Sequence, residues 1–316
     1  MLHLTDTDLR ACPLDCQQVA DALADAFSDL ARGQAAIHPR QRSACGDVRL
    51  ATMGALWPRR GLAGVKSYPT VAGQFGFALV LFDLATNRPI GLFEGAELTR
   101  LRTAAMTAMV ASRAARAARA DARVLALFGC GQQGRAQAEA LLECFALQEV
   151  RVVDPNPDIG GCDRLQATTG TRVRLVGAEA ALRGADLVVT ATRSSEPVFD
   201  GRWLADDAFV AAIGTSTPTG RELDDETLAR AARIVVEWRP QCIAEAGELV
   251  HWAHGRYLDK VVDLAQLFAE EAPWRPAAGH GAGPTIFKSV GVGLADLAAA
   301  SAALALLAPG LAREAA

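Results

Sequence analysis

The feature that most constrains the fold of this chain is a glycine-rich turn between an apolar strand and a helix. Residues 124–128 are apolar and predict a buried strand, and a GxGxxG pattern follows directly over residues 129–134. A helix is predicted at residues 135–145, and a second strand at residues 149–153 ends at Asp154. This order predicts a Rossmann unit that binds a dinucleotide.

Each residue of the turn has an expected role in cofactor binding. Gly129 permits a tight turn, Gly131 removes a side chain that would block the pyrophosphate, and Gly134 lets the helix pack closely on the strand. The helix N-terminus offers unpaired N–H groups and the positive end of the helix dipole to the phosphates. Gln132 and Gln133 complete the set of cofactor contacts expected here.

Asp154 bears on the choice of cofactor. It follows Gly134 by about twenty residues, the spacing expected of a carboxylate that accepts hydrogen bonds from the adenosine ribose. A 2′-phosphate would be repelled by this charge, and residues 155–158 contain no arginine or lysine to receive one. The sequence therefore favours NAD(H) over NADP(H).

Composition limits the class of protein. The chain has 316 residues, is 51% hydrophobic and carries a net charge of −4, so it can bury a full core and shows no basic footprint for nucleic acid. We interpret four arginines at near-helical spacing as the solvated face of an alanine-rich helix: Arg113, Arg116, Arg119 and Arg123. The seven cysteines form no CxxC pair, which favours a reduced, cytoplasmic protein, and neither a signal peptide nor a membrane span is expected.

Alternating strands and helices occupy the middle of the chain. Beyond residue 153, further strands are predicted at residues 173–176, 186–191, 209–213 and 234–237, which indicates a parallel sheet. The N-terminal part predicts a helix at 16–32, strands at 48–53, 64–67 and 76–82, and a turn at 85–89. A final apolar helix is expected at 290–307, after a loop rich in proline, glycine and alanine at 272–284.

A second group of motifs lies outside the nucleotide-binding pattern. The strings are EGAELTRLRTAA at 94–105, GTSTP at 214–218 with RELD at 221–224, and FKSVG at 287–291, together with the isolated Lys66. In combination with a Rossmann unit, they resemble the ornithine cyclodeaminase/μ-crystallin family over residues 35–300.

The resemblance implies the architecture. Family members have a Rossmann domain inserted into a discontinuous α+β domain that binds substrate and pairs its sheet across a homodimer. By this likeness, residues 114–290 form the NAD-binding domain, and residues 1–113 plus 291–316 form the substrate-binding and dimerisation domain. Members reduce or oxidise imine and amino-acid substrates with a nicotinamide cofactor.

The resemblance also implies residues that hold the substrate. Lys66 matches the lysine that contacts the substrate carboxylate and its carbonyl or imine region. Arg40 matches the arginine that binds the carboxylate, although the shorter spacing to Met53 leaves Arg42 as a substitute. Val290 matches a position beside the substrate. These types suit the chemistry, because a guanidinium binds a carboxylate in bidentate fashion and a desolvated lysine gives up a proton readily.

Further cofactor contacts follow from the same likeness. Arg102 matches an arginine that reaches the pyrophosphate, Thr192 and Ile213 match positions that line the adenosine and nicotinamide halves, and Ser289 matches a residue beside the nicotinamide. Gln74 departs from the threonine that some members place there, which puts this contact in doubt.

Ser216 separates the activities within the family. Cyclodeaminases carry an aspartate at the aligned position, and a serine cannot act as a carboxylate base. The expected function is therefore reduction of a small cyclic imino acid, of the Δ1-pyrroline-2-carboxylate or Δ1-piperideine-2-carboxylate type, to the L-amino acid, with Lys66 and Ser216 as catalytic residues. The alternatives are an amino-acid dehydrogenase of the alanine dehydrogenase type, an ornithine cyclodeaminase, which Ser216 disfavours, and a non-catalytic binder of small molecules.

No metal is expected. Glu248, His251 and His254 have an ExxHxxH spacing, but no further cysteine or histidine cluster completes a site, so structural histidines are favoured. Cys130 lies within the glycine turn, where its backbone matters more than its thiol.

Overall fold

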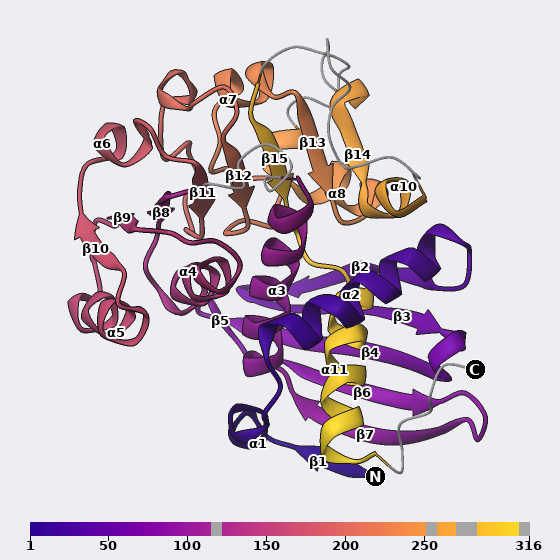
Figure 1. Cartoon of the computed structure of the whole chain (residues 1–316). Helices are drawn as coiled ribbons and strands as arrows, with labels where there is room; N and C mark the ends of the chain where they lie inside the picture. Colours follow the sequence, from indigo (N-terminus) through magenta and orange to yellow (C-terminus); the bar gives the residue numbers. More distant parts are fainter. Residues whose placement is uncertain (115–121, 251–257, 270–282, 310–316) are drawn as a thin grey trace. The chain divides into compact units, whose positions relative to one another are not determined.

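The computed structural model describes residues 1–114, 122–250, 258–269 and 283–309. The chain forms two compact units. The first combines Met1–Met106 with Gly291–Ala316, and the second is Thr107–Val290. Each unit contains its own sheet (Figure 1).

The sheet of the first unit is mostly antiparallel. Its strands are β1 (Leu2–Leu4), β2 (Ala36–Cys45), β3 (Val48–Trp57), β4 (Leu62–Val71), β5 (Gln74–Phe75), β6 (Ala78–Asp83) and β7 (Arg88–Glu94). They lie in the order β1-β7-β6-β4-β3-β2, with β5 paired to β4. Only β1 and β7 run parallel among these pairs.

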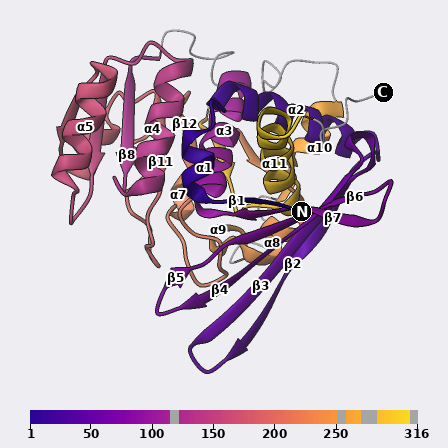
Figure 2. The same cartoon turned by 90° about the horizontal axis from the view of Figure 1, so that it is seen from below.

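Helices cover one face of this sheet. They are α1 (Asp6–Ala11), α2 (Cys16–Ala31), the first half of α3 (Ala96–Ala114) and α11 (Gly293–Leu307), with the short 3-10 helix η1 (Pro58–Arg60) between β3 and β4. Helix α2 begins at a capping box in which Asp15 and Gln18 accept each other's backbone N–H groups. Helix α11 packs on α2 and on strands β2, β3 and β4, so its first eight residues, Gly293–Ala300, are buried on every side (Figures 1 and 2).

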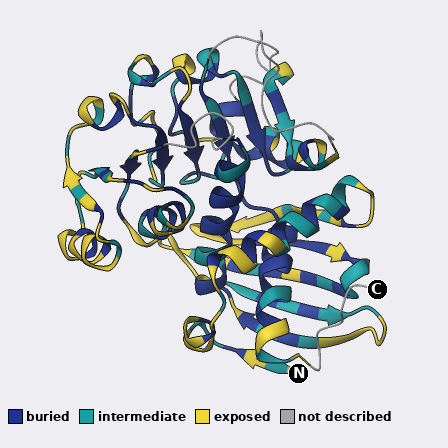
Figure 3. Ribbon diagram, viewed as in Figure 1, coloured by how far each residue is buried: buried dark blue, intermediate teal, exposed yellow. Residues whose placement is uncertain are grey.

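The alternation of side chains along β3 and β4 distinguishes the two faces of the sheet. Met53 and Trp57 are buried on the helix-covered face, as is Lys66 of β4. Leu50 and Val65 alternate with these residues, point to the other face and stay about half exposed. Figure 3 shows exposed stretches along the strands of this sheet. The uncovered face therefore exposes apolar side chains on β3 and β4.

The sheet of the second unit is parallel throughout its described strands. These are β8 (Val124–Phe128), β9 (Glu149–Val153), β10 (Arg172–Leu175), β11 (Leu187–Thr190), β12 (Phe209–Ala212), β13 (Arg233–Val236), β14 (Val261–Asp263) and β15 (Thr285–Lys288). Their order is β10-β9-β8-β11-β12-β15-β13-β14. The chain order therefore reverses between β8 and β11, and dinucleotides bind at such a switch point.

Short helices flank this sheet. They are α4 (Gln132–Cys144), α5 (Ile159–Thr169), α6 (Ala178–Leu182), α7 (Asp225–Arg230), α8 (Arg239–Glu245), α9 (Gly247–Val250) and α10 (Leu264–Ala269), with the 3-10 helices η2 (Gly201–Trp203) and η3 (Leu258–Lys260). Helix α4 packs on β8 and β11, and α6 on β8 and β9. The strands between them are almost fully buried (Figure 3). The predicted α/β fold class with a parallel nucleotide-binding sheet is confirmed.

Several elements differ from the sequence prediction. Strand β2 escaped prediction because nearly all its residues are exposed, which leaves no alternation to detect. Strand β15 was not predicted, and its last two residues are the first two of the FKSVG motif. Helix α11 starts at residue 293 rather than 290 because Gly291 adopts a left-handed backbone conformation. The predicted turn at 85–89 is shorter, since β7 already begins at Arg88.

The interpretation of the four arginines as one solvated helix face is wrong for the two that are described. Arg113 is half-buried in α3, with its guanidinium 5.2 Å from the ring centre of Phe268. Arg123 lies beyond the helix, next to β8. Arg116 and Arg119 lie outside the described residues, as does most of the predicted loop at 272–284. Within the described ranges, no helix is long and apolar enough to cross a membrane.

Candidate active site

Lysine is rare in this chain. Of the 32 lysine and arginine residues in the sequence, only three are lysines: Lys66, Lys260 and Lys288. Two of the three are buried, Lys66 at 2% exposure and Lys288 at 1%. A lysine is almost never fully buried unless it is paired, so the neighbours of these two ammonium groups are candidates for a functional site.

Lys66 lies in β4, in the first unit, with its ammonium held by three neighbours. The Nζ atom donates to Asp296 Oδ1 at 2.8 Å and to Thr99 Oγ1 at 2.6 Å. It also stands 4.5 Å from the ring centre of Phe77, close enough for a cation–π interaction. Burial lowers the pKa of Lys66 to about 8, even though the Asp296 carboxylate acts to raise it. The ammonium is thus both fixed and ready to lose a proton near neutral pH.

Arg40 lies on the same face of the sheet, two strands away. Lys66 is the register partner of Met53 across β3 and β4, and a bulge in β2 places Arg40 beside Met53. One guanidinium nitrogen of Arg40 lies 3.4 Å from the Met53 sulfur. Two cations therefore flank one apolar side chain, an arrangement suited to a small carboxylic acid. Arg42, by contrast, is exposed on β2.

Arg102 of α3 belongs to the same cluster. Its Nε donates to Asp296 Oδ1 at 3.1 Å, and the side chain is almost fully buried. Burial acts to raise the pKa of Asp296, but Arg102 and Lys66 lower it below the ordinary value. The cluster of Arg40, Lys66, Arg102 and Asp296, the basic cluster from here on, thus holds three cations and one anion.

Gly291 organises the edge of the basic cluster. Its backbone has φ +77°, a conformation that favours glycine, and its carbonyl accepts from Arg40 at 2.8 Å. A methyl group added at Gly291 would lie 3.0 Å from a guanidinium nitrogen of Arg102 and 3.4 Å from one of Arg40. The glycine of the FKSVG motif therefore lets two guanidinium groups approach the backbone.

The glycine turn follows β8 in the second unit. Gly129 has φ +86°, and a side chain there would collide with the carbonyl of Ala191 after β11. Asp154 Oδ2 accepts from the Cys130 amide at 2.8 Å, and its Oδ1 accepts from the Asn156 amide at 2.9 Å. The carboxylate is thus fixed beside the turn, as a ribose acceptor needs to be.

The phosphate end of the turn has the space that a dinucleotide needs. A methyl group added at Gly131 would meet nothing within 4 Å, and Gly131 and Gln132 are exposed at the start of α4, with Gln133 half-buried. At Gly134 an added methyl group would overlap the Gly129 carbonyl. These residues fit a nicotinamide dinucleotide, with the pyrophosphate at the N-terminus of α4.

One arginine near the turn was missed by the sequence prediction. Arg135 of α4 donates to the Cys130 carbonyl at 2.8 Å and forms an ion pair with Asp158 at 2.8 Å. It directly follows Gly134 in the sequence, so its place beside the turn could have been predicted, whereas its pairing with Asp158 depends on the fold. Because Asp158 offsets its charge, Arg135 does not by itself make the turn a site for a 2′-phosphate.

Glu222, from the RELD string, supports two of the predicted cofactor contacts. It is fully buried, and its carboxylate accepts from the backbone and hydroxyl of Thr192 at 2.7 Å each and from the Gly214 amide at 2.8 Å. The segments that follow β11 and β12 are thereby joined. Ile213 and Ser216 lie in the second of these segments and are half-buried.

Lys288 and Glu248 form the second buried ion pair, at 3.1 Å. Lys288 also donates to the carbonyl of Thr215, next to Ser216, while Glu248 accepts from the Glu222 amide. Glu248, the first residue of the ExxHxxH spacing, is therefore a fully buried partner of lysine. His251 and His254 lie outside the described residues.

Ser289 and Val290 share one carboxylate. The Ser289 hydroxyl donates to Glu237 at 2.9 Å, and the Val290 amide donates to the other oxygen of Glu237 at 2.9 Å. Glu237 fixes this pair at the end of β15. Its position directly after β13 was the available signal, because a charged residue that ends a buried strand needs a partner.

The cysteines are free thiols. Cys130 lies 3.3 Å from Cys162, sulfur to sulfur, and burial raises the pKa of the Cys130 thiol to about 12. Such a thiol is a poor nucleophile, consistent with a structural role.

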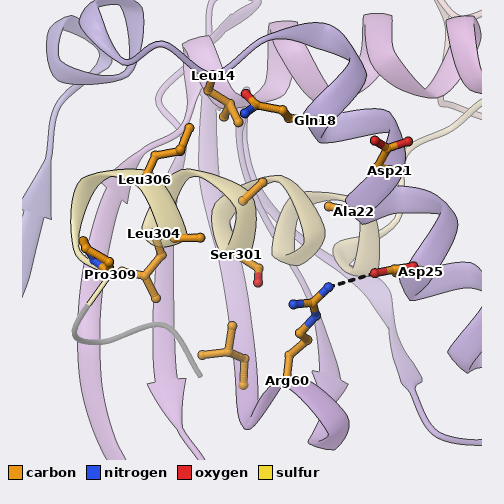
Figure 4. Close-up of a pocket in the computed structure, with 13 residues that line it drawn as sticks. Leu14, Gln18, Asp21, Ala22, Asp25, Arg60, Ser301, Leu304, Leu306 and Pro309 are labelled. Carbon is orange, nitrogen blue, oxygen red and sulfur yellow. Dashed lines mark hydrogen bonds and ion pairs between the residues drawn. The ribbon is translucent and has the colours of Figure 1, made fainter. Parts of the chain in front are cut away.

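A separate cavity of about 460 Å³ lies between α2 and α11 in the first unit (Figure 4). Leu304 and Leu306 line it, together with Gln18 and the ion pair of Arg60 with Asp25. It shares no residue with the basic cluster.

Comparison with known proteins places these features in context. The model of the ornithine cyclodeaminase/mu-crystallin family matches residues 11–304. The ketimine reductase mu-crystallin of Mus musculus is 31% identical over 226 residues, which cover 71% of this chain and 67% of the relative. The NAD(P)H-dependent anabolic L-arginine dehydrogenase DauB of Pseudomonas aeruginosa is 32% identical over 296 residues and 90% of both chains.

A solved structure agrees over nearly the whole chain. The probable ornithine cyclodeaminase from Bordetella pertussis Tohama I superposes with a TM-score of 0.90 and 40% identity, covering 98% of each chain. These three relatives are thus named for three different activities: ketimine reductase, L-arginine dehydrogenase and ornithine cyclodeaminase.

Proposed function

This chain belongs to the ornithine cyclodeaminase/mu-crystallin family, and from that premise we propose that it is an NADH-dependent reductase of a small cyclic imino acid. The substrate would be of the Δ1-pyrroline-2-carboxylate or Δ1-piperideine-2-carboxylate type, and the product the L-amino acid. The observation that carries the proposal is the pair of cations, Arg40 and a buried Lys66, on either side of Met53.

The basic cluster supplies the groups that the reaction needs. Arg40 binds the carboxylate, since a guanidinium offers two parallel donors. Lys66 contacts the same carboxylate and delivers the proton that the imine nitrogen takes up. The hydride for the imine carbon comes from the bound nicotinamide. Ser216 has a hydroxyl and no carboxylate, and it is proposed to orient water for this proton transfer.

Cofactor binding is assigned to the second unit. The open space at Gly131 and the fixed carboxylate of Asp154 support NADH at the glycine turn. Gly129, Gln132, Gln133, Gly134, Thr192, Ile213 and Ser289 are proposed as the further contacts, with Arg102 for the pyrophosphate and Val290 beside the substrate.

We also propose that the protein works as a homodimer. The face of β3 and β4 that lies opposite the helices leaves large apolar side chains 43–49% exposed: Val48, Leu50, Leu56 and Val65. Large apolar residues exposed together on one sheet face mark an interaction surface, and we propose that a second copy of the chain covers it.

An assay of NADH oxidation tests the proposed reaction. We expect turnover with Δ1-pyrroline-2-carboxylate or Δ1-piperideine-2-carboxylate, and none with pyruvate and ammonia. Ammonia-dependent oxidation of NADH with 2-oxo acids would instead identify an amino-acid dehydrogenase, the activity class in the name of the DauB relative. Release of ammonia from L-ornithine would identify a cyclodeaminase, and tight binding without turnover a binding protein.

Cofactor choice gives a further prediction. Replacing Asp154 by Ser and Asn156 by Arg together should raise the preference for NADPH over NADH by roughly tenfold or more, because a charged hydrogen bond contributes about 1.5–3 kcal/mol. The ratio of kcat/KM for the two cofactors measures it. Asn156→Arg alone is the matched control, since it keeps the repelling carboxylate. A wild-type enzyme that already strongly prefers NADPH would contradict the assigned role of Asp154.

A further inference from the structure

One acid lies within the apolar start of helix α11. Asp296 is 1% exposed, and the residues around it in the helix, such as Leu294 and Leu297, are fully buried. A carboxylate at such a position is costly unless cations compensate it. The residue therefore has a partner or a function that justifies its burial.

Asp296 accepts hydrogen bonds from two cations with a single carboxylate oxygen. Its Oδ1 accepts from Lys66 Nζ at 2.8 Å and from Arg102 Nε at 3.1 Å. Its Oδ2 is buried and has no hydrogen-bond partner among the described residues. The carboxylate also lies in the first turn of α11, where the helix dipole favours a negative charge.

The other groups that face Lys66 do not replace this acid. The Thr99 hydroxyl of α3 accepts one hydrogen bond from the ammonium, and the Phe77 ring offers only its π-face. Arg102 and Arg40 are like charges that oppose protonation of Lys66. Asp296 is thus the anion that keeps this ammonium charged inside the protein.

We propose that Asp296 is a positioning residue, which fixes the Lys66 ammonium and the Arg102 guanidinium and keeps Lys66 protonated until the substrate takes its proton. The proton-delivery part rests on the proposed function. In that step an N–H bond of Lys66 breaks and a new N–H bond forms on the imine nitrogen, while the imine carbon receives the hydride of NADH. Lys66 becomes a neutral amine and regains its proton from solvent, and Asp296 stays ionised throughout.

The small number of lysines makes the proposal directly measurable. Protein labelled with ¹³C at the lysine ε-carbon gives signals from Lys66, Lys260 and Lys288 only, apart from natural abundance. The variants Lys66→Arg and Lys260→Arg assign them by loss of a signal. The titration midpoint of Lys66 can then be read in the intact protein without any substrate.

We expect Asp296→Asn to lower the Lys66 midpoint by about 1 to 3 pH units, because an opposite charge within hydrogen-bonding distance shifts a pKa by that amount. Asp296→Glu, which retains the charge, should lie closer to the wild type. Arg102→Gln should raise the midpoint, since it removes a like charge. Glu97→Gln is the matched control: Glu97 is 5% exposed and paired with Arg100, so the Lys66 midpoint should not move.

A folded Asp296→Asn protein whose Lys66 midpoint equals that of the wild type would overturn the proposal. If this variant does not fold, Arg102→Gln and the charge-balanced double variant Arg102→Gln/Asp296→Asn replace it. The double variant should then titrate lower than the single one, and equal midpoints would overturn the proposal in the same way.

Kinetics separate this inference from the proposed reaction. With an imino acid as substrate, the alkaline limb of kcat/KM in Asp296→Asn should move down in pH by the same amount as the Lys66 midpoint. A shifted midpoint with an unmoved limb would overturn the catalytic part of the proposal. A wild-type enzyme without imine turnover would remove the proposed function, while the NMR titration would still decide whether Asp296 controls Lys66.

Discussion

Lys66→Ala should lower kcat/KM for imine reduction by about a hundredfold or more, the usual cost of losing a general acid–base group, while NADH binds almost as before. NADH affinity should persist because Lys66 is not among the residues proposed to contact the dinucleotide. Steady-state kinetics and fluorescence titration with NADH measure the two effects. In the wild type, kcat/KM should fall as the pH rises through about 8, since burial lowers the pKa of Lys66 to about 8. The pH profile of Lys66→Ala should lack this fall.

Two further variants define the role of the ammonium. Lys66→Arg should not restore activity, because a guanidinium keeps the charge but gives up its proton far less readily and needs a wider slot. Arg40→Ala should act mainly on KM, since carboxylate capture is largely the same in the ground and transition states. Arg42→Ala, on the exposed side of β2, is the control and should leave both constants unchanged. A nearly silent Lys66→Ala would place the chemistry elsewhere.

A pair of glycine substitutions should separate folding from cofactor binding. At Gly134 a methyl group would overlap the Gly129 carbonyl, so Gly134→Ala should destabilise the protein without any ligand, with overpacking costing about 1–3 kcal/mol or more. At Gly131 a methyl group meets nothing within 4 Å, so Gly131→Ala should leave the melting temperature of the free protein unchanged. Its NADH affinity should nevertheless fall by about tenfold or more, because the methyl group occupies the space assigned to the pyrophosphate.

Thermal unfolding with and without NADH distinguishes the two variants. Stabilisation by a ligand follows the ratio of its concentration to its Kd, so Gly131→Ala should lose most of the upward shift that NADH gives the wild type. A Gly131→Ala protein that binds NADH normally would contradict the placement of the cofactor at this turn.

The nucleotide-binding fold was predictable because its signals are local. The strand, the glycines and Asp154 fall within about thirty residues, and each has a fixed geometric role. Strand β2 gave no such signal, since it is exposed along nearly its whole length and its partner β3 is what orders it. The bulge that brings Arg40 beside Met53 was equally invisible in the sequence, because it depends on the pairing of two strands.

The supporting acids of the candidate site were also missed, for a related reason. The partners of these acids are distant in sequence, and some of them lie where strands of the folded sheet end. The acids are Asp296, Glu222 and Glu237. A signal for Asp296 was available, since a single acid inside an apolar helix requires a buried cation. The sequence did not indicate that Lys66 is the cation paired with Asp296, because many pairings of helix and strand would satisfy the same pattern.

The pairing of Lys66 with Asp296 has a consequence for how the protein is made. The two residues are 230 positions apart, so while a ribosome synthesises the chain, the Lys66 ammonium lacks this counter-ion until Asp296 has emerged. Helix α11 likewise packs on strands β2, β3 and β4 only after residues 293–307 have been synthesised. The first unit should therefore complete its folding late, only after the second unit, which lies between its two segments in the sequence, has been synthesised.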